Sequence, residues 1–357
     1  MFPLKASEEA HYIPMPGRRQ AFPALLRQMQ EQTRTASASA TENTGGPETF
    51  PGEDSMNDEK DEVISMEFLS YLISGVSLGS VYAIIALGYT MVYGIAKMLN
   101  FAHGDVIMVG GYISLMAMSS LGLPWWLAVV LAMLVCTVLG VVIEGLAYKP
   151  LRSAPSLAVL ITAIGVSYFL QNSALLIWGA NPKAYTPIIS GAVKLFEGQL
   201  SISYVSLLTV FMCLVIMVAL TLFTGKTRMG KAMRACSEDK AAAQLMGINV
   251  NRTISMTFAI GSALAAIAGV LLCSSYTSLM PTTGSMPGIK AFTAAVFGGI
   301  GSIPGALLGG ILLGIIESMA KAYISTQLAN SIVFAVLIIM LLVRPAGLLG
   351  KYVPEKV

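Results

Sequence analysis

Charged side chains are scarce in this chain of 357 residues, since only 11% are Asp, Glu, Lys or Arg while 55% are hydrophobic. Soluble domains carry about 25% charged residues. So little charge, together with repeated apolar runs of about 20 residues, is typical of a chain that crosses a membrane several times. The composition therefore excludes an ordinary soluble domain, and we expect no nucleic-acid partner.

Histidine and cysteine are also rare. The two histidines, His11 and His103, are too few for a histidine-based metal site. The four cysteines show no metal-ligand spacing, and three of them lie in apolar runs. We therefore expect reduced cysteines, no metal and no cofactor.

A complete phosphate-binding loop is missing as well. Gly225, Lys226 and Thr227 match the end of such a loop, but Leu220 stands where its first glycine belongs, and no strand precedes it. No series of intramembrane carboxylates is present either, which counts against an ion-driven pump. If the protein moves a solute, its energy must come from a partner.

Residues 1–65 differ from the rest of the chain because they are rich in Pro, Ser, Thr and acidic residues. They contain no continuous apolar stretch of the kind that marks a secretory signal. Such a composition cannot bury enough surface to offset the entropy of ordering, so we expect a disordered extension over 1–65. The alternative is a mis-called start, with translation beginning at Met56 or Met66.

Residues 66–357 predict an all-α polytopic membrane domain with eight or nine transmembrane segments, some of them broken or re-entrant. Pairs of glycines four residues apart, such as Gly75 with Gly79 and Gly310 with Gly314, predict close packing between helices. The apolar runs are 68–96, 106–121, 127–147, 156–178, 204–224, 253–275, 289–297, 306–322 and 330–343.

The segment 225–252 is the one long polar interruption of this body. Its six basic side chains predict a cytoplasmic location under the positive-inside rule. We expect Ser237 to cap a short helix with Glu238 and Asp239 in its first turn, and Gly247 to end that helix. A small solvent-facing helix of this kind is expected to bind a partner.

The orientation of the N-terminus is left open by the pattern. Five full crossings before the loop would place the N-terminus outside. If 106–121 is only a half-helix, the N-terminus faces the cytoplasm.

Polar residues at membrane depth are costly to bury and are therefore candidates for a translocation pathway. The alternative is that they form interfacial loops or hydrogen bonds between helices. The candidates are Asn100, His103, Asp105, Gln171 and Asn172.

Other acidic residues have simpler explanations. We expect Glu144 to pair with Lys149 or Arg152, and Glu317 to pair with Lys321 four residues later.

A glycine-rich break interrupts the apolar pattern near the C-terminal end. A helix, a break and a second helix occur at 82–115 and again at 289–316, and such repeats often point to a transport pathway. The alternative is that the glycines simply end helices at the surface. The residues of this break are Gly298, Gly299, Gly301, Pro304 and Gly305.

Several motifs together resemble one family over 66–357. They lie at 75–83, 88–94, 100–104, 148–152, 234–239, 290–296 and 298–306. Through them the sequence resembles the LivH-type permease of high-affinity branched-chain amino-acid ABC transporters, the inner membrane component of a binding-protein-dependent transport system.

This resemblance implies a permease and not an enzyme. It would sit in the cell inner membrane and translocate leucine, isoleucine and valine by alternating access. The implied partners are a second LivM-like permease subunit, two cytoplasmic ABC ATPase subunits and a periplasmic amino-acid-binding protein. The alternatives are the same architecture serving another small solute, such as urea or amides, and an ion-coupled secondary carrier.

The resemblance also implies an ATPase-docking surface in the cytoplasmic loop. Permeases of ABC importers dock through a loop with a leading glutamate and a glycine, but here Ala241 occupies the glutamate position and only the glycine is kept. The charged contact must then come from a neighbouring residue. The expected coupling residues are Arg234, Glu238, Asp239 and Gly247.

Overall fold

The computed structural model describes residues 53–152, 154–195 and 200–350, with side chains from Ser65 onward. The chain divides into two units, 1–61 and 62–357, and the membrane body belongs to the second. The sequence predicts a disordered extension over 1–65. Residues 1–52 of it lie outside the described residues, and residues 53–65 form the beginning of the first described helix.

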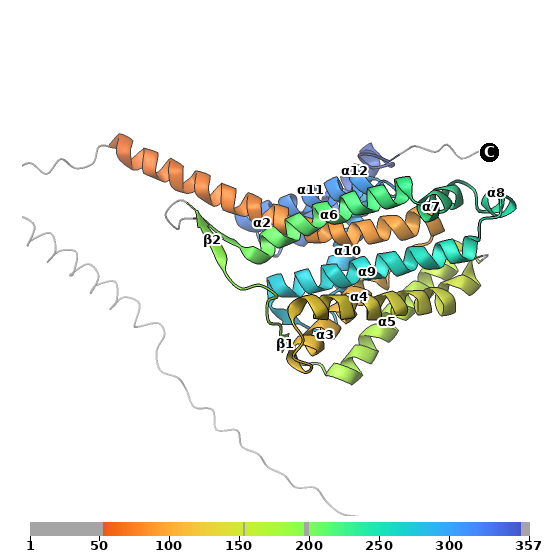
Figure 1. The fold of residues 1–357 in the computed structure, drawn as a ribbon. Coiled ribbons are helices and arrows are strands. Elements are labelled where there is room, and N and C mark those ends of the chain that lie inside the picture. Colours follow the sequence, from red (N-terminus) through yellow and green to blue (C-terminus); the bar gives the residue numbers. More distant parts are fainter. Residues whose placement is uncertain (1–52, 153, 196–199, 351–357) are drawn as a thin grey trace, which may run out of the picture. The chain divides into compact units, whose positions relative to one another are not determined.

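Helices dominate the described part of the chain (Figure 1). A π-helical turn, Glu144–Tyr148, and a 3₁₀ turn, Lys149–Leu151, follow α4. The α-helices are α2 Glu53–Ala96, α3 His103–Ser119, α4 Trp125–Ile143, α5 Ser156–Trp178, α6 Tyr204–Lys226, α7 Arg228–Glu238, α8 Lys240–Leu245, α9 Val250–Tyr276, α10 Ser285–Gly298, α11 Ile303–Tyr323 and α12 Ala329–Val343.

Six helical segments in the described residues are long and apolar enough to cross a membrane. They are Ser65–Ala96, Trp125–Leu151, Ser156–Trp178, Tyr204–Lys226, Val250–Tyr276 and Ile303–Tyr323. The helices α3, α10 and α12 have 17, 14 and 15 residues. At about 1.5 Å per residue, each is shorter than a hydrocarbon core of about 30 Å. The helical, polytopic class is therefore confirmed, and the number of eight or nine segments stays a prediction.

Four short strands depart from the all-α prediction. β1 Lys183–Ala184 pairs antiparallel with β4 Ser278–Leu279, and β2 Ala192–Leu195 pairs antiparallel with β3 Leu200–Ser203. All four lie in connections between helices, where backbone N–H and C=O groups lack a helical partner and bond to each other instead.

The glycine pairs expected to pack closely do meet one another. A Cβ atom on Gly79 in α2 would lie 2.7 Å from the Cα of Ile311 in α11, and one on Gly314 would collide with the Cα of Gly79. Likewise, a Cβ on Gly309 would overlap the backbone oxygen of Ala294 in α10. Glycine at these positions lets three backbones approach directly, so α11 lies between α2 and α10.

The interior is built around α9, which packs against α3 and α4. In its most apolar window 78% of the residues are buried, whereas the corresponding share for α5 is 17%. Helix α5 thus presents most of its surface outward, to lipid or to another subunit.

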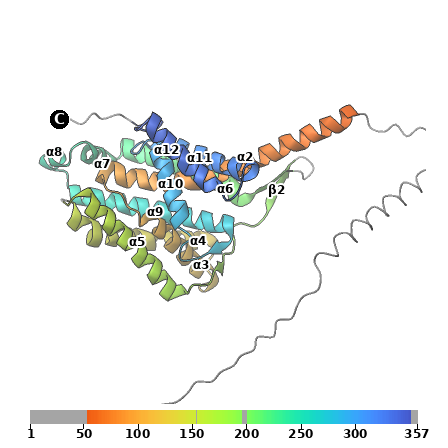
Figure 2. The same cartoon turned by 180° about the vertical axis from the view of Figure 1, so that it is seen from behind.

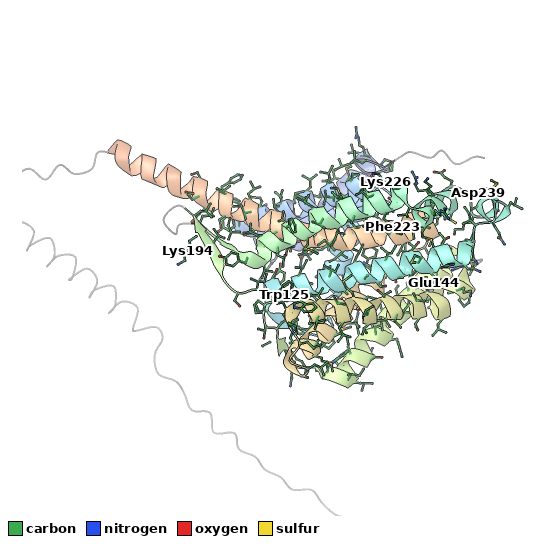
Figure 3. All side chains as sticks on the ribbon, in the orientation of Figure 1. Trp125, Glu144, Lys194, Phe223, Lys226 and Asp239 are labelled. Carbon is green, nitrogen blue, oxygen red and sulfur yellow. The ribbon has the colours of Figure 1, made fainter. Side chains whose placement is uncertain are left out.

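The two ends of the helical body differ in character. Figure 3 shows Trp125 and Lys194 toward one end, and Glu144, Lys226 and Asp239 toward the other. The Nζ of Lys240 in α8 donates to the backbone oxygen of Ala96 at 2.8 Å, which places the end of α2 on the same side as the loop 225–252.

Five helices, α2 to α6, precede that loop. The views from both sides show α2 entering the body from the end opposite α7 and α8 (Figures 1 and 2). Helix α2 thus runs toward the side on which the loop 225–252 lies, and the orientation of the N-terminus stays a prediction.

Candidate functional site

The loop 225–252 folds into two short helices instead of the single one expected. Helix α7 begins after Thr227, whose Oγ1 accepts from the backbone N–H of Gly230 at 2.9 Å. Its buried face is formed by Gly230, Met233 and Cys236. This face packs on Met91 and Ile95 near the end of α2, with Ile303 at the start of α11 beside them.

The cap of α8 corrects one expectation. Asp239, and not Ser237, caps this helix, because its Oδ1 accepts from the backbone N–H groups of Ala241 and Ala242 at 2.7 and 3.1 Å. Ser237 lies inside α7, where its hydroxyl donates to the backbone oxygen of Arg234 at 2.7 Å. A carboxylate at an N-cap also interacts favourably with the helix dipole, which gives Asp239 the advantage over a hydroxyl.

Gly247 ends α8 as the pattern predicts. Its φ of +82° lies in the left-handed region, which suits glycine, and a Cβ there would meet nothing within 4 Å. The expected coupling residues Arg234, Glu238 and Asp239 are also exposed. All four predicted positions are therefore accessible to a partner.

Two apolar residues at the tip of this loop escaped the sequence analysis. Leu245 and Met246 are 89% and 82% exposed, although the segment is otherwise polar. In the sequence they look like ordinary helix formers. The signal in the sequence is their position directly before Gly247, the residue expected to end the helix. Helix α8 is too short to bury side chains at its last turn.

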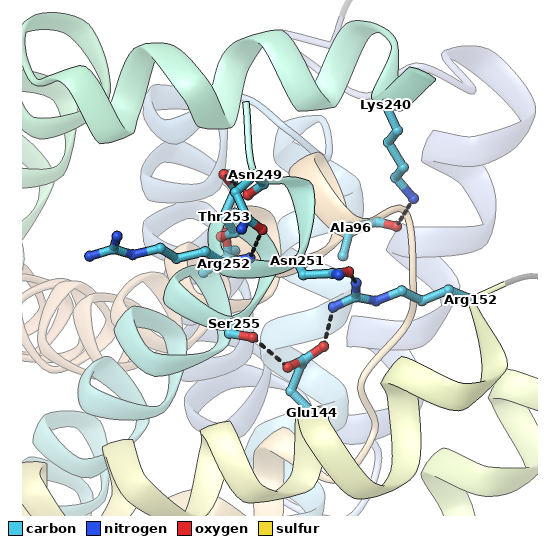
Figure 4. A network of polar contacts seen from close by, with 10 residues as sticks. Ala96, Glu144, Arg152, Lys240, Asn249, Asn251, Arg252, Thr253 and Ser255 are labelled. Atoms are coloured by element: carbon cyan, nitrogen blue, oxygen red, sulfur yellow. Dashed lines mark hydrogen bonds and ion pairs between the residues drawn. The ribbon is translucent and has the colours of Figure 1, made fainter. Parts of the chain in front are cut away.

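A polar network fastens the loop to the membrane helices (Figure 4). Glu144 forms an ion pair with Arg152, one of its two predicted partners, and its second oxygen accepts from the hydroxyl of Ser255 in α9 at 2.6 Å. Arg152 also donates to the Oδ1 of Asn251. Burial, together with repulsion from Arg152 and Lys97, lowers the pKa of Lys240 from its usual value.

The predicted glycine break lies beside this loop. Gly298 is the last residue of α10, and Gly299 and Gly301 have φ values of +104° and +96°. Pro304 and Gly305 lie in the first turn of α11, which Ser302 caps by accepting from the N–H of Gly305 at 3.2 Å.

The chain reverses direction at this break, because Gly298 faces Gly305 and Ala294 faces Gly309. Helices α10 and α11 are therefore two arms of a hairpin, and not one interrupted helix. A cavity of about 320 Å³ separates the break from α7, and its walls include Gly94, Gly301, Pro304, Met233 and Arg234.

Four of the described side chains, two of them predicted, form a polar cluster between helices. The Nε2 of Gln171 in α5 lies 2.9 Å from the Oδ1 of Asp105 in α3, 3.3 Å from the hydroxyl of Ser285 in α10, and 3.2 Å from the hydroxyl of Ser167 in α5. Asp105 and Ser285 belong to the first turns of their helices. Here two short helices begin beside the outward-facing α5.

The remaining pathway candidates lie elsewhere. Asn100 is buried in the connection between α2 and α3 and accepts from the Tyr148 hydroxyl at 2.9 Å, so it joins this connection to the turn that follows α4. His103 is 1% exposed, packs against the ring of Tyr89 at a centroid distance of 4.6 Å, and its Nε2 has no hydrogen-bond partner among the described residues. Asn172 is exposed and bonds only to the backbone of its own helix in the described contacts.

A second buried cluster is larger than expected. Glu317, which is 1% exposed, pairs with the predicted Lys321 at 2.6 Å, and also with Lys290 of α10 at 2.7 Å. The hydroxyl of Tyr82 in α2 donates to the same carboxylate at 2.9 Å. Because Tyr82 and Lys290 lie far from Glu317 in the sequence, only the fold could bring them to it.

The fold defines a multi-pass helical membrane protein with a polar loop anchored to its helices. Over residues 71–342 the sequence matches the family described as "Branched-chain amino acid transport system / permease component". The chain belongs to this family.

Individual relatives agree with that assignment. The chain is 46% identical to the high-affinity branched-chain amino acid transport system permease protein LivH of Escherichia coli (strain K12), a match covering 81% of this chain and 98% of the relative. It is 45% identical to BraD of Pseudomonas aeruginosa, with the same coverage. The probable LivH protein of Methanocaldococcus jannaschii is 30% identical, over 75% of this chain and 88% of that protein.

Among solved structures, PsaBC from Streptococcus pneumoniae in complex with Fab has a TM-score of 0.44 and 15% identity, covering 82% of this chain and 97% of that one. That likeness is too weak to place any residue of this chain.

Proposed function

We propose that this chain is the transmembrane permease subunit of an ATP-binding cassette importer that carries leucine, isoleucine and valine across the inner membrane. The relatives named above, at 45–46% identity over nearly their whole length, support this substrate class. The observation that carries the role of the chain within the importer is the exposed apolar tip Leu245–Met246, held on a loop that is anchored to the membrane helices.

Coupling to ATP hydrolysis proceeds through this loop. An exposed Leu–Met pair surrounded by charged residues is a suitable centre for a protein interface, because apolar anchors with a polar rim are typical of binding hot spots. The surface around it includes Arg234, Glu238, Asp239 and Gly247. Movement of α7 is transmitted to the end of α2 and to the start of α11, on which its buried face packs.

The partners in this proposal are two cytoplasmic ATPase subunits, a second LivM-like permease and a periplasmic amino-acid-binding protein. The outward face of α5, which the described chain leaves largely uncovered, supports a second membrane subunit on that side. The nine apolar helices of the described part, α2 to α6 and α9 to α12, all count as membrane segments, with α3, α10 and α12 as partial crossings.

The pathway runs beside the cluster of Asp105, Gln171 and Ser285. Two helix N-termini meet there with a partly buried amide, and helix N-termini carry partial positive charge that suits a substrate carboxylate. Alternating access then consists of relative movement between α5 and the α10–α11 hairpin. A partner can drive such movement only by binding the two states with different affinity.

Reconstitution of the chain in proteoliposomes tests the proposal. With its partner subunits and internal ATP, the wild-type chain is expected to accumulate leucine, and the Leu245→Asp variant to bind the ATPases at least tenfold more weakly, because a charge is costly in an apolar contact. Lys194→Glu, on the opposite end of the body, serves as the control and should bind normally. If the chain alone accumulates leucine against a gradient, it is a secondary carrier and the proposal is wrong.

The same assay examines the pathway. Gln171→Leu keeps a similar side-chain volume but removes the donor to Asp105 and Ser285, so leucine uptake should fall while ATPase binding is retained. Asn172→Leu, at the adjacent exposed position, is the matched control. Equal uptake by both variants would contradict the pathway assignment.

A further inference from the structure

We propose that a basic pocket beside the loop binds an anionic group, either a carboxylate or a phosphate, carried by a molecule with a small aliphatic part. The pocket has a volume of about 420 Å³, which lies in the range of ligand sites. It lies between the end of α2, the start of α5 and the first residue of α8. This proposal goes beyond the transport function and does not depend on it.

The pocket gathers three positive charges from separate parts of the chain. Lys97 follows α2, Arg152 precedes α5 and Lys240 begins α8. Among the described residues, the one carboxylate paired with any of these three is Glu144, and its oxygens already accept from Arg152 and Ser255. Three cations against one carboxylate leave an excess of positive charge that an anion would neutralise.

Unused hydrogen-bond donors accompany this charge. The Nε of Arg152 is buried and has no partner among the described residues. Lys240 donates to the backbone oxygen of Ala96, and an ammonium group has three N–H bonds to give. Figure 4 shows Lys240 reaching the backbone oxygen of Ala96, and Arg152 reaching Glu144 and Asn251. Both residues line the pocket. A buried guanidinium N–H without an acceptor is costly, and an anion in the pocket would supply the missing acceptor.

The lining residues other than the three cations determine the part of the ligand next to its anionic group. It is mostly aliphatic and aromatic, so an acyl or branched alkyl group fits beside the anionic head. An ammonium group on the ligand would be repelled by the three cations, which disfavours a zwitterionic amino acid. The larger apolar side chains in the lining are Tyr93, Met98, Leu99, Leu157, Val159 and Leu160.

Occupation of the pocket would act on the loop. Lys240 is the first residue of α8, and its present acceptor is the last residue of α2. An anion that draws Lys240 toward Arg152 and Lys97 therefore links α8 to the start of α5. Such a ligand would stabilise one position of the loop relative to the membrane helices.

Two sources can supply this chemistry, and two probes separate them. The purified full chain is placed in nanodiscs of phosphatidylcholine, with and without phosphatidylglycerol, and retained lipid is measured by native mass spectrometry. In phosphatidylcholine alone, 4-methylpentanoate is titrated and binding is followed by thermal stability. Retention of phosphatidylglycerol would identify a lipid phosphate, and a response to 4-methylpentanoate would identify a free carboxylate.

The variants decide whether the pocket is responsible. One basic residue near a membrane surface is worth about 1 kcal/mol toward an anion, which corresponds to roughly fivefold in affinity. Lys97→Gln should therefore weaken binding about fivefold, and Lys97→Gln with Lys240→Gln about 25-fold. Lys231→Gln, an exposed residue of α7 outside the pocket, should leave binding unchanged.

Lys97 is exposed, and the described contacts give its side chain no hydrogen bond or ion pair. Its single replacement should therefore not affect folding, and Lys97→Gln alone tests the pocket if the double variant does not fold. The proposal is overturned if neither probe binds the wild type. It is also overturned if Lys97→Gln binds the probe as tightly as the wild type and the control Lys231→Gln do. Because the assay contains no ATPase and measures no uptake, its failure would leave the transport proposal standing.

Discussion

At the scale of single residues, Glu317 has the most demanding environment. Its carboxylate is buried and accepts from Lys290, Lys321 and Tyr82, which come from three helices. A buried charge is stable only if a counter-charge is buried beside it, because removing one member of the buried pair leaves the other charge without compensation.

Replacing Glu317 should therefore lower the free energy of unfolding much more than replacing Lys321, its predicted partner four residues later. Glu317→Gln leaves Lys290 buried without a counter-charge and is expected to cost about 3–5 kcal/mol of unfolding free energy. Lys321→Gln removes a half-exposed partner and is expected to cost about 0.5 kcal/mol. Denaturant unfolding of the purified protein in detergent measures both. Similar losses in the two variants would show that Lys290 and Glu317 do not form the central pair.

At the scale of elements, the packing of α2 on α11 depends on glycine. Gly314→Val would place two methyl groups where the backbone of Gly79 now lies, so the helices must separate. Overpacking costs about 1–3 kcal/mol, and we expect the upper part of this range or more because the obstacle is backbone. Gly165→Val in α5, where a Cβ would meet nothing within 4 Å, is the matched control. Thermal unfolding should separate the two variants, and equal stability would contradict the contact.

At the scale of the whole molecule, the loop 225–252 and the hairpin of β2 and β3 should face opposite sides of the membrane, because only α6 lies between them. The four native cysteines are all buried, so an introduced cysteine can be labelled selectively. In intact spheroplasts, Lys194→Cys should react with an impermeant maleimide, whereas Lys231→Cys should react only after permeabilisation. Labelling of Lys231→Cys in intact spheroplasts would reverse the orientation.

Local chemistry made much of the fold predictable. The membrane class, the boundaries of α5 and the end of α8 at Gly247 follow from hydropathy and backbone preferences, which neighbouring residues decide among themselves. The pairing of Glu144 with Arg152 could also be predicted from the sequence, because the two residues are only eight positions apart. The cap of α8 was misplaced because several residues there can cap a helix, and the backbone path selects one.

What the sequence determined alone was the polytopic helical class, the polar loop and the glycines that permit close packing, because each depends on solvent preference or backbone freedom at one place in the chain. The tertiary structure alone decided which glycine faces meet, that Lys290 and Tyr82 join Glu317, and that Lys97, Arg152 and Lys240 line one pocket. Those contacts join residues far apart in the chain, and only the packing of the helices on one another brings them together. A pattern of neighbouring residues carries no information about contacts between such distant positions.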